Sequence, residues 1–266
     1  MLKASKRGKP FLISALGLVL AGLGCAPAGR QPLIVGMELN YPPFEMVDAR
    51  GQADGISVEL AKALGQYLQR EVRIENIPFD GLIPALKTRK IDLIISSMTA
   101  TPERAQSITF SAPYLHTGLC LLVNRRANLH SIEQADQPGC TIVVKQGTTG
   151  QLYARAHLRR ARVLVLEKED ACVLEVVQGK AQAFLYDQMS VFHHWQRNPE
   201  TTEALLKPFQ EEDWAIGLRQ GDESLKERVN AFLAAYRAEG GFQRLGDHYL
   251  KEQKAAFQKL GVPFDF

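Results

Sequence analysis

The chain has 266 residues, of which 45% are hydrophobic and 23% are charged, so it can bury one large core or two smaller ones. Its formal net charge of +3 depends on four lysines and arginines near the N-terminus, and removal of a leader would leave the rest close to neutral. No basic run with interleaved aromatic residues remains there, which excludes the usual pattern of a nucleic-acid-binding protein.

The N-terminal residues are typical of an export signal. A basic start is followed by the apolar run Phe11 to Gly24, which is shorter than the roughly 20 residues that a membrane-spanning helix needs. Cys25 follows Gly22-Leu23-Gly24, an order that resembles the cleavage box of bacterial lipoproteins, although an aliphatic residue is usual at the place of Gly22. We expect residues 1–24 to be a signal peptide, Cys25 to carry a lipid and residues 25–32 to be a linker. Ordinary cleavage and an uncleaved anchor are the alternatives.

The remaining cysteines, Cys120, Cys140 and Cys172, match no zinc-binding spacing. Buried free thiols and a Cys140–Cys172 disulfide, which export would permit, are both compatible with the sequence. His193 and His194 are adjacent on a predicted helix, point different ways and lack a ligand partner at a suitable spacing, so we expect a solvated helix face. No metal and no cofactor is expected.

Apolar strand-like runs alternate with helix-like segments along the chain. In order, we predict a strand at Leu33 to Met37, a helix at Val58 to Arg70 capped by Ser57, a strand at Val72 to Ile77, a short helix capped by Asp80, and a strand at Ile91 to Ser96. After residue 140 we predict strands at Thr141 to Lys145, Arg162 to Leu166, Ala183 to Tyr186 and Trp214 to Leu218, with helices at Gln151 to Leu158, Asp170 to Gln178 and Ser224 to Glu239. This alternation predicts parallel α/β units in two domains, followed by a C-terminal helical segment.

One segment concentrates chemistry suited to an anion. The predicted strand ending at Ser96 leads through hydroxyl-bearing residues into a helix that begins with Thr101 as N-cap and Pro102 in the first helical position. Ligands of open α/β sheets bind at the carboxyl ends of strands, and a helix start offers free N–H groups. Arg104 adds a planar fork that can hold a carboxylate by two hydrogen bonds. The sequence thus indicates a small carboxylate site here, although an ordinary strand-to-helix turn with a surface arginine is the alternative.

Several motifs in one order resemble those of the polar-amino-acid-binding components of bacterial ABC importers, solute-binding protein family 3. They are Leu33 to Glu45 (LIVGMELNYPPFE), Gly55 to Lys62 (GISVELAK), Phe79 to Lys87 (FDGLIPALK), Ile91 to Arg104 (IDLIISSMTATPER), Phe110 to Tyr114 (FSAPY), Val144 to Thr149 (VKQGTT) and Ala183 to Asp187 (AFLYD). The resemblance runs from about Leu33 to Tyr249. It implies a ligand site made of Glu38, Tyr41, Phe79, Ser97, Met98, Thr99, Arg104, Lys145, Thr149 and Asp187.

The resemblance also implies a role for most of these residues. Arg104, with Thr99 and Ser97, would hold the ligand carboxylate, Thr149 would reach the carboxylate on closure, and Asp187 would receive the α-ammonium. Tyr41 and Phe79 would enclose the side chain, and Glu38 and Lys145 would lie at its far end. Simpler roles remain open, because Asp187 could only cap the following helix, the aromatic residues could be plain core, and Glu38 and Lys145 could be surface charges.

The glutamate at position 38 departs from many relatives, which have an aspartate or an uncharged residue there. A free Glu38 would suit the cationic side chain of arginine or lysine. Alternatively, a Glu38–Lys145 pair would leave a pocket for an uncharged, glutamine-like side chain. The sequence does not decide between the two.

We therefore expect a two-lobed α/β binding protein whose lobes are joined by a two-strand hinge. Lobe 1 would comprise residues 33–117 and 215–266, and lobe 2 residues 118–214, with crossings near Gly118 and Trp214. The expected function is delivery of a free polar amino acid to an ABC permease and its ATPase, by a lipid-anchored, exported monomer that is not an enzyme and binds no nucleic acid. A dehydratase of cyclic carboxylic acids on the same fold, with Glu38, Lys145 or His116 as acid or base, and an extracellular sensor domain are the alternatives.

Overall fold

The structure is a computed structural model that describes residues 1–2 and 31–262. Residues 3–30, which include most of the predicted leader and Cys25, lie outside the described part. Within that part, none of the helices combines the length and the apolar character needed to span a membrane.

An eight-stranded sheet organises residues 31–262, in the strand order β4-β1-β5-β10-β6-β9-β7-β8. β1 pairs in parallel with β4 and β5, and β7 pairs in parallel with β8 and β9. β10 runs antiparallel to β5 and β6, and β6 runs antiparallel to β9. The strands are β1 (Leu33–Met37), β4 (Val72–Asn76), β5 (Leu93–Ile94), β6 (Thr109–Asn124), β7 (Thr141–Lys145), β8 (Arg162–Leu166), β9 (Ala183–Asp187) and β10 (Thr202–Leu218), besides a separate pair, β2 (Met46–Val47) and β3 (Ala53–Asp54).

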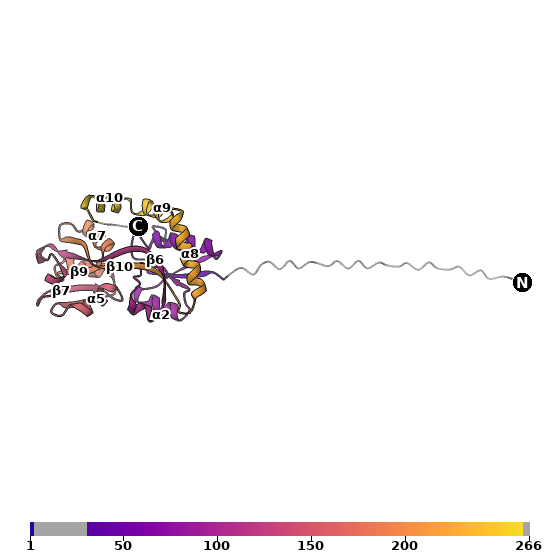
Figure 1. Cartoon of the computed structure of the whole chain (residues 1–266), viewed down its shortest axis with the longest axis horizontal. Coiled ribbons are helices and arrows are strands. Elements are labelled where there is room, and N and C mark those ends of the chain that lie inside the picture. The colour runs from indigo at the N-terminus through magenta and orange to yellow at the C-terminus, as the bar shows by residue number, and fades with distance from the viewer. Residues whose placement is uncertain (3–30, 263–266) are drawn as a thin grey trace. The chain divides into compact units, whose positions relative to one another are not determined.

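Helices cover the sheet on both sides of the long central strands. The helices are α1 (Ile56–Leu68), α2 (Leu82–Lys87), α3 (Pro102–Ala105), α4 (Ile132–Ala135), α5 (Thr149–His157), α6 (Glu169–Val177), α7 (Gln188–Arg197), α8 (Glu223–Ala238), α9 (Gly241–Tyr249) and α10 (Lys251–Leu260), with 3-10 turns η1 (Phe79–Gly81) and η2 (Arg125–Ala127). In Figure 1, β6 and β10 lie between β7 and β9 on one side and α2 and α8 on the other. We call the β4-β1-β5 side the first half and the β9-β7-β8 side the second half.

The hydrophobic pattern explains most of these elements. In α1, Leu60, Ala61, Leu64 and Leu68 recur at helical spacing and are all buried, as the sequence predicts. The predicted helix caps at Ser57 and Asp80 are wrong. Ser57 lies inside α1, which begins after Gly55, and the helix after Asp80 begins after Gly81. Both side chains are used elsewhere, because the Ser57 hydroxyl donates to Glu45 and the Asp80 carboxylate accepts from Gln146 of the second half.

The two halves are connected by β6 and β10, whose pairing extends from Thr109–Leu218 to Asn124–Thr202 with interruptions. Gly118 lies in the middle of this pairing, and a Cβ atom there would come within 2.5 Å of the Gln210 carbonyl oxygen. The close approach of the two strands therefore requires glycine at that position. A second connection is made by α10, where Phe257 packs against Phe192 of α7 with ring centroids 4.6 Å apart.

The expected fold class is confirmed: the chain is a two-lobed α/β protein with two parallel units joined by long strands. Cys120, Cys140 and Cys172 are buried free thiols, so the Cys140–Cys172 disulfide is not formed. The expectation of a solvated face for both histidines is wrong for His194, which is buried and whose Nε2 lies 2.9 Å from Glu169 Oε1. In the described part, no group of three or more histidine, cysteine or acidic side chains is placed to hold a metal ion.

Candidate functional site

Two adjoining cavities lie between the halves. The Arg104 cavity has a volume of about 20 Å³ and is lined by Phe79, Ser97, Thr99, Arg104, Thr148, Thr149, Tyr186, Asp187, Glu212 and Trp214. The Glu45 cavity also has a volume of about 20 Å³ and is lined by Glu38, Tyr41, Glu45, Phe79, Ser96, Ser97, Tyr186 and Asp187. Each is far smaller than the roughly 300–1,000 Å³ of a site for a drug-sized ligand, and four residues line both. The halves are therefore closed around two small spaces that are lined mainly by polar side chains.

Arg104 places a buried guanidinium in the first of these cavities. Its Nη1 donates to the Thr99 carbonyl at 2.7 Å, and its Nη2 donates to the Gly147 carbonyl of the second half at 3.0 Å. These bonds occupy two of the five N–H groups of the side chain, so others remain for a ligand. Burial lowers the pKa of Arg104 to about 10, which still leaves it charged at neutral pH.

The sequence predicts a helix N-terminus beside Arg104, and the structure contains only part of that feature. Thr101 does cap α3, since its hydroxyl accepts from the Arg104 N–H at 3.1 Å, and Pro102 is in the first position. However, α3 ends at Ala105 after four residues, so its dipole is small. Ser97 lies just before it with a φ of 47°, a left-handed conformation that is uncommon for serine. The cation at this site is therefore the guanidinium rather than the helix start.

Asp187 stands at the end of β9 in the second half and lines both cavities. Its Oδ1 accepts from the Tyr41 hydroxyl at 2.5 Å, and from the N–H groups of Met189 and Ser190 at 3.0 and 3.1 Å. It therefore caps α7, and it also faces the space between the halves. Burial raises the pKa of Asp187 to about 7, against the lowering effect of the Tyr41 hydrogen bond. A buried cation would stabilise its ionised form.

The aromatic residues form the walls of the site. Tyr41 is buried and stacks on Phe44 with centroids 5.6 Å apart, while Trp214 meets its edge at 5.9 Å. Phe79 lines both cavities, and the Arg104 guanidinium lies 5.4 Å from its ring centroid. Tyr41 thus lines the Glu45 cavity and is also part of an aromatic core, and Phe79 lines both cavities.

Glu38 and Lys145 form an ion pair between the halves. Lys145 Nζ donates to Glu38 Oε2, and the lysine is only 1% exposed. A lysine at such a position needs a carboxylate partner, because an isolated buried ammonium would be strongly destabilising. Of the two arrangements left open by the sequence, the structure therefore contains the pair and not the free Glu38.

The profile of the bacterial extracellular solute-binding proteins, family 3, matches residues 33–252. The chain belongs to this family. It is 32% identical to the L-arginine-binding protein of Pseudomonas aeruginosa over 253 residues, covering 91% of this chain and 96% of that protein. An ancestral arginine-binding protein, solved with arginine, is 28% identical with a TM-score of 0.76, covering 84% of this chain and 99% of that chain. An ancestral arginine-binding protein solved with glutamine is also 28% identical, with a TM-score of 0.74, covering 83% of this chain and 98% of that chain. The ancestral amino acid-binding protein AncCDT-1, a precursor of cyclohexadienyl dehydratase, is 31% identical with a TM-score of 0.76, covering 82% of this chain and 94% of that chain.

Two buried acids of this solute-binding protein line the cavities, although the sequence analysis assigned neither of them a role. Glu45 is part of the Leu33 to Glu45 motif, is 1% exposed and lines the Glu45 cavity. Glu212 lies in β10 and accepts from the Thr99 hydroxyl at 3.0 Å, next to Arg104. Burial raises the pKa of Glu212, and hydrogen bonds from Thr149 and Thr99 oppose that rise. Glu212 precedes the predicted strand at Trp214 to Leu218 and lies in an acidic run, so no pattern in the sequence indicated its burial.

Three more predicted residues have clear positions in this solute-binding protein. Thr149 is the first residue of α5 and lines the Arg104 cavity. Met98 is 1% exposed among apolar side chains of the first half and lines neither cavity. His116 is largely exposed and lies 2.5 Å from Asp213, away from both cavities.

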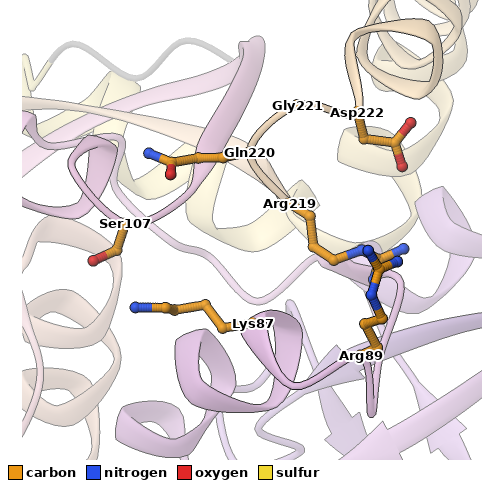
Figure 2. Close-up of a pocket in the computed structure, with 7 residues that line it drawn as sticks. All are labelled: Lys87, Arg89, Ser107, Arg219, Gln220, Gly221 and Asp222. Carbon is orange, nitrogen blue, oxygen red and sulfur yellow. The ribbon is translucent and has the colours of Figure 1, made fainter.

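A separate pocket of this solute-binding protein lies beyond the end of β10. It is lined by Lys87, Arg89, Ser107, Arg219, Gln220, Gly221 and Asp222, and Figure 2 shows the side chains of Lys87 and Ser107 on one side of the view and those of Arg89 and Arg219 on the other. Arg219 is already engaged, since it donates to the Ile91 carbonyl at 2.7 Å and to Asp92 at 3.3 Å. No lining residue comes from the second half, so a ligand there would not bridge the halves.

Proposed function

We propose that this chain is the amino-acid-binding component of an ABC importer, and that one free polar amino acid bridges its two halves. The observation that carries the proposal is the placement of Arg104 and Asp187. They come from opposite halves, are both buried, and line the same cavity. A zwitterion taken out of water needs a partner for each of its charges, and these residues supply one of each sign.

Within the proposal, the guanidinium of Arg104 binds the α-carboxylate through two parallel hydrogen bonds, with the Thr99 and Thr149 hydroxyls beside it. Asp187 accepts the α-ammonium, and the Tyr41 and Phe79 rings enclose the side chain. Closure then follows from a population shift, because a ligand that contacts both halves stabilises only the closed arrangement. The relatives named above, which bind arginine or glutamine, support a side chain that is basic or glutamine-like.

The finer parts of the proposal concern location and partners. We propose that the chain is exported and lipid-anchored at Cys25, that it acts as a monomer, and that a permease and an ATPase receive its ligand. We keep residues 33–117 and 215–266 as lobe 1 and residues 118–214 as lobe 2. The Cys25→Ser variant should move the protein from the membrane fraction to the soluble periplasmic fraction, whereas unchanged fractionation would contradict the lipid anchor.

A thermal-shift screen with the twenty amino acids, followed by calorimetry, tests the function. A ligand at a hundred times its dissociation constant should raise the free energy of unfolding by about 2.7 kcal/mol. The relative that is a precursor of a dehydratase makes catalysis the second candidate. Recovery of the bound amino acid unchanged after incubation supports a binding protein, and its chemical conversion would support an enzyme. A screen in which none of the amino acids stabilises the protein would contradict the proposal.

A further inference from the structure

The pocket beyond the end of β10, which we call the basic pocket, carries an excess of positive charge. It has a volume of about 380 Å³, and its lining includes three basic side chains, Lys87, Arg89 and Arg219. One acidic side chain, Asp222, also lines it, and Figure 2 shows the Asp222 carboxylate directed away from Lys87. This carboxylate accepts from the Leu225 N–H at 3.3 Å as the N-cap of α8. The basic pocket is therefore suited to contact an anion.

Most of this positive charge is not neutralised by the protein itself. The Lys87 and Arg89 side chains are exposed and form no ion pair or hydrogen bond with the residues that the structure describes. Arg219 donates to Asp92, but Asp92 also accepts from Arg70, so two arginines share one carboxylate. The charged residues that flank these side chains in the sequence do not reverse the balance, since they are Arg73, Lys90 and Lys226 against Glu71 and Glu223.

The basic pocket and the N-terminal entry of the chain lie at the same end of the first half. Arg70 donates to the Gln31 carbonyl at 2.8 Å and to the Pro32 carbonyl at 2.7 Å, just before β1 begins. Its Nη2 also donates to Asp92 Oδ2 at 3.0 Å, and Arg219 contacts the other oxygen of the same carboxylate. A continuous series of contacts therefore connects Gln31 to the lining of the basic pocket.

The two cavities between the halves lie at the other end of the same strands. Glu38 follows β1 and Ser96 follows β5, and both line the Glu45 cavity. Pro32 and Asp92 instead precede these two strands. Because β1 and β5 are parallel, their starts share one end of the first half and their carboxyl ends share the opposite end. A surface that contacted the basic pocket would therefore leave the cavities on the side directed away from it.

The sequence limits how far the basic pocket can move from a lipid on Cys25. Gln31 is six residues after Cys25, the proposed site of the lipid. A fully extended chain covers at most about 3.6 Å per residue, so Gln31 stays within about 22 Å of the anchored residue. Such a tether raises the effective concentration of lipid headgroups at the basic pocket. Each basic side chain near an anionic membrane then adds attraction, which decays within a Debye length of about 8 Å.

We propose that the basic pocket docks on anionic lipid headgroups of the membrane that holds the lipid anchor, and that the phosphate of one headgroup occupies it. This inference rests on the lipid anchor of the proposed function and adds an orientation to it. The planar Arg89 guanidinium suits phosphate oxygens, and Lys87 adds a second positive charge. A docked protein has its first half against the membrane and its cavities directed toward the solution from which a free amino acid enters.

Acetylation of lysines on the full lipidated protein, reconstituted on vesicles, tests the docking. The vesicles consist of phosphatidylcholine alone or of phosphatidylcholine with phosphatidylglycerol, and mass spectrometry gives the acetylation rate of each lysine. We expect Lys87 to react several-fold more slowly on the anionic vesicles, and high salt should remove this protection. Lys168, an exposed lysine of the second half, should react equally on both. Equal rates for Lys87 on both vesicles would overturn the inference while leaving the anchor intact. Protein that does not associate with either vesicle would refute both.

One variant, one control and one competing anion assign the protection to the basic pocket. Arg89→Gln should reduce the protection of Lys87 about fivefold, because one basic side chain near an anionic membrane contributes about that factor. Arg160→Gln removes the same charge from an exposed position of the second half and should leave the protection unchanged. Full protection of Lys87 in Arg89→Gln would overturn the assignment. Inorganic phosphate that protects Lys87 on phosphatidylcholine vesicles as strongly as the anionic lipid does would identify a site for a soluble anion and would also overturn the membrane docking.

Discussion

Replacement of Arg104 by alanine is the most direct perturbation of the carboxylate site. The buried guanidinium would hold a carboxylate by two charge-assisted hydrogen bonds of about 1.5–3 kcal/mol each. Removing one partner of a buried ion pair typically costs about 3–5 kcal/mol, which is consistent with that sum. At about 1.4 kcal/mol per factor of ten, the affinity for any amino acid should fall roughly 150- to 4,000-fold.

Calorimetry against the best ligand of the screen measures this loss. Arg104→Lys keeps the charge but not the planar fork, so its affinity should lie between those of the wild type and Arg104→Ala. Arg73→Ala, a change of an exposed arginine on β4, is the matched control and should bind normally. Circular dichroism should check the fold, because Arg104 also bonds Thr99 and Gly147. Binding by folded Arg104→Ala within about threefold of the wild type would refute the assignment.

Three further outcomes follow from the same geometry. Asp187→Asn keeps a side-chain oxygen that can cap α7 but loses the negative charge that would pair with the α-ammonium. Calorimetry should therefore show that the affinity falls by about a hundredfold. The free energy of unfolding in urea should change by about 1 kcal/mol or less. Burial raises the pKa values of Asp187 and Glu45 to about 7 and about 8, above those of the unfolded chain. The free energy of unfolding, measured in urea, should therefore fall as the pH rises from about 4 to 8 and then level off. A constant free energy of unfolding over this range would contradict the burial of these two acids. Gly147→Ala would place a Cβ atom of the second half 2.9 Å from the Cβ atom of Asp80 in the first half. Ligand affinity should therefore fall, and small-angle scattering should report a more open protein. An unchanged affinity would show that closure does not bring these two residues together.

Much of the fold was predictable because the short strands are strongly apolar. The bounds of β1, β7 and β8 match the predicted ranges, since each is a run of mainly aliphatic residues between turns or charges. Of the long strands β6 and β10, the sequence predicted only the end of β10, as a strand at Trp214 to Leu218, and crossings near Gly118 and Trp214. Their full extent depends on pairing with each other between the halves, which local periodicity does not contain.

The candidate site was predictable where a motif carried the residue. Arg104 was predicted from the hydroxyl-rich segment that leads into the helix after Thr101, and Asp187 from the resemblance of the Ala183 to Asp187 motif to the family. Glu45 and Ser57 could not be assigned from the sequence, because their hydrogen bond joins a loop to a helix interior and a serine near a helix start usually caps it. Whether Glu38 is free or paired with Lys145 likewise depended on how closely the halves approach.

The central claim is that one amino acid joins Arg104 and Asp187 across the two halves. A crystal structure of the protein with its bound amino acid tests it most directly. The account predicts the ligand carboxylate within hydrogen-bonding distance of the Arg104 guanidinium, and the α-ammonium within the same distance of the Asp187 carboxylate. A ligand bound away from both residues, or in the pocket beyond β10, would contradict the account.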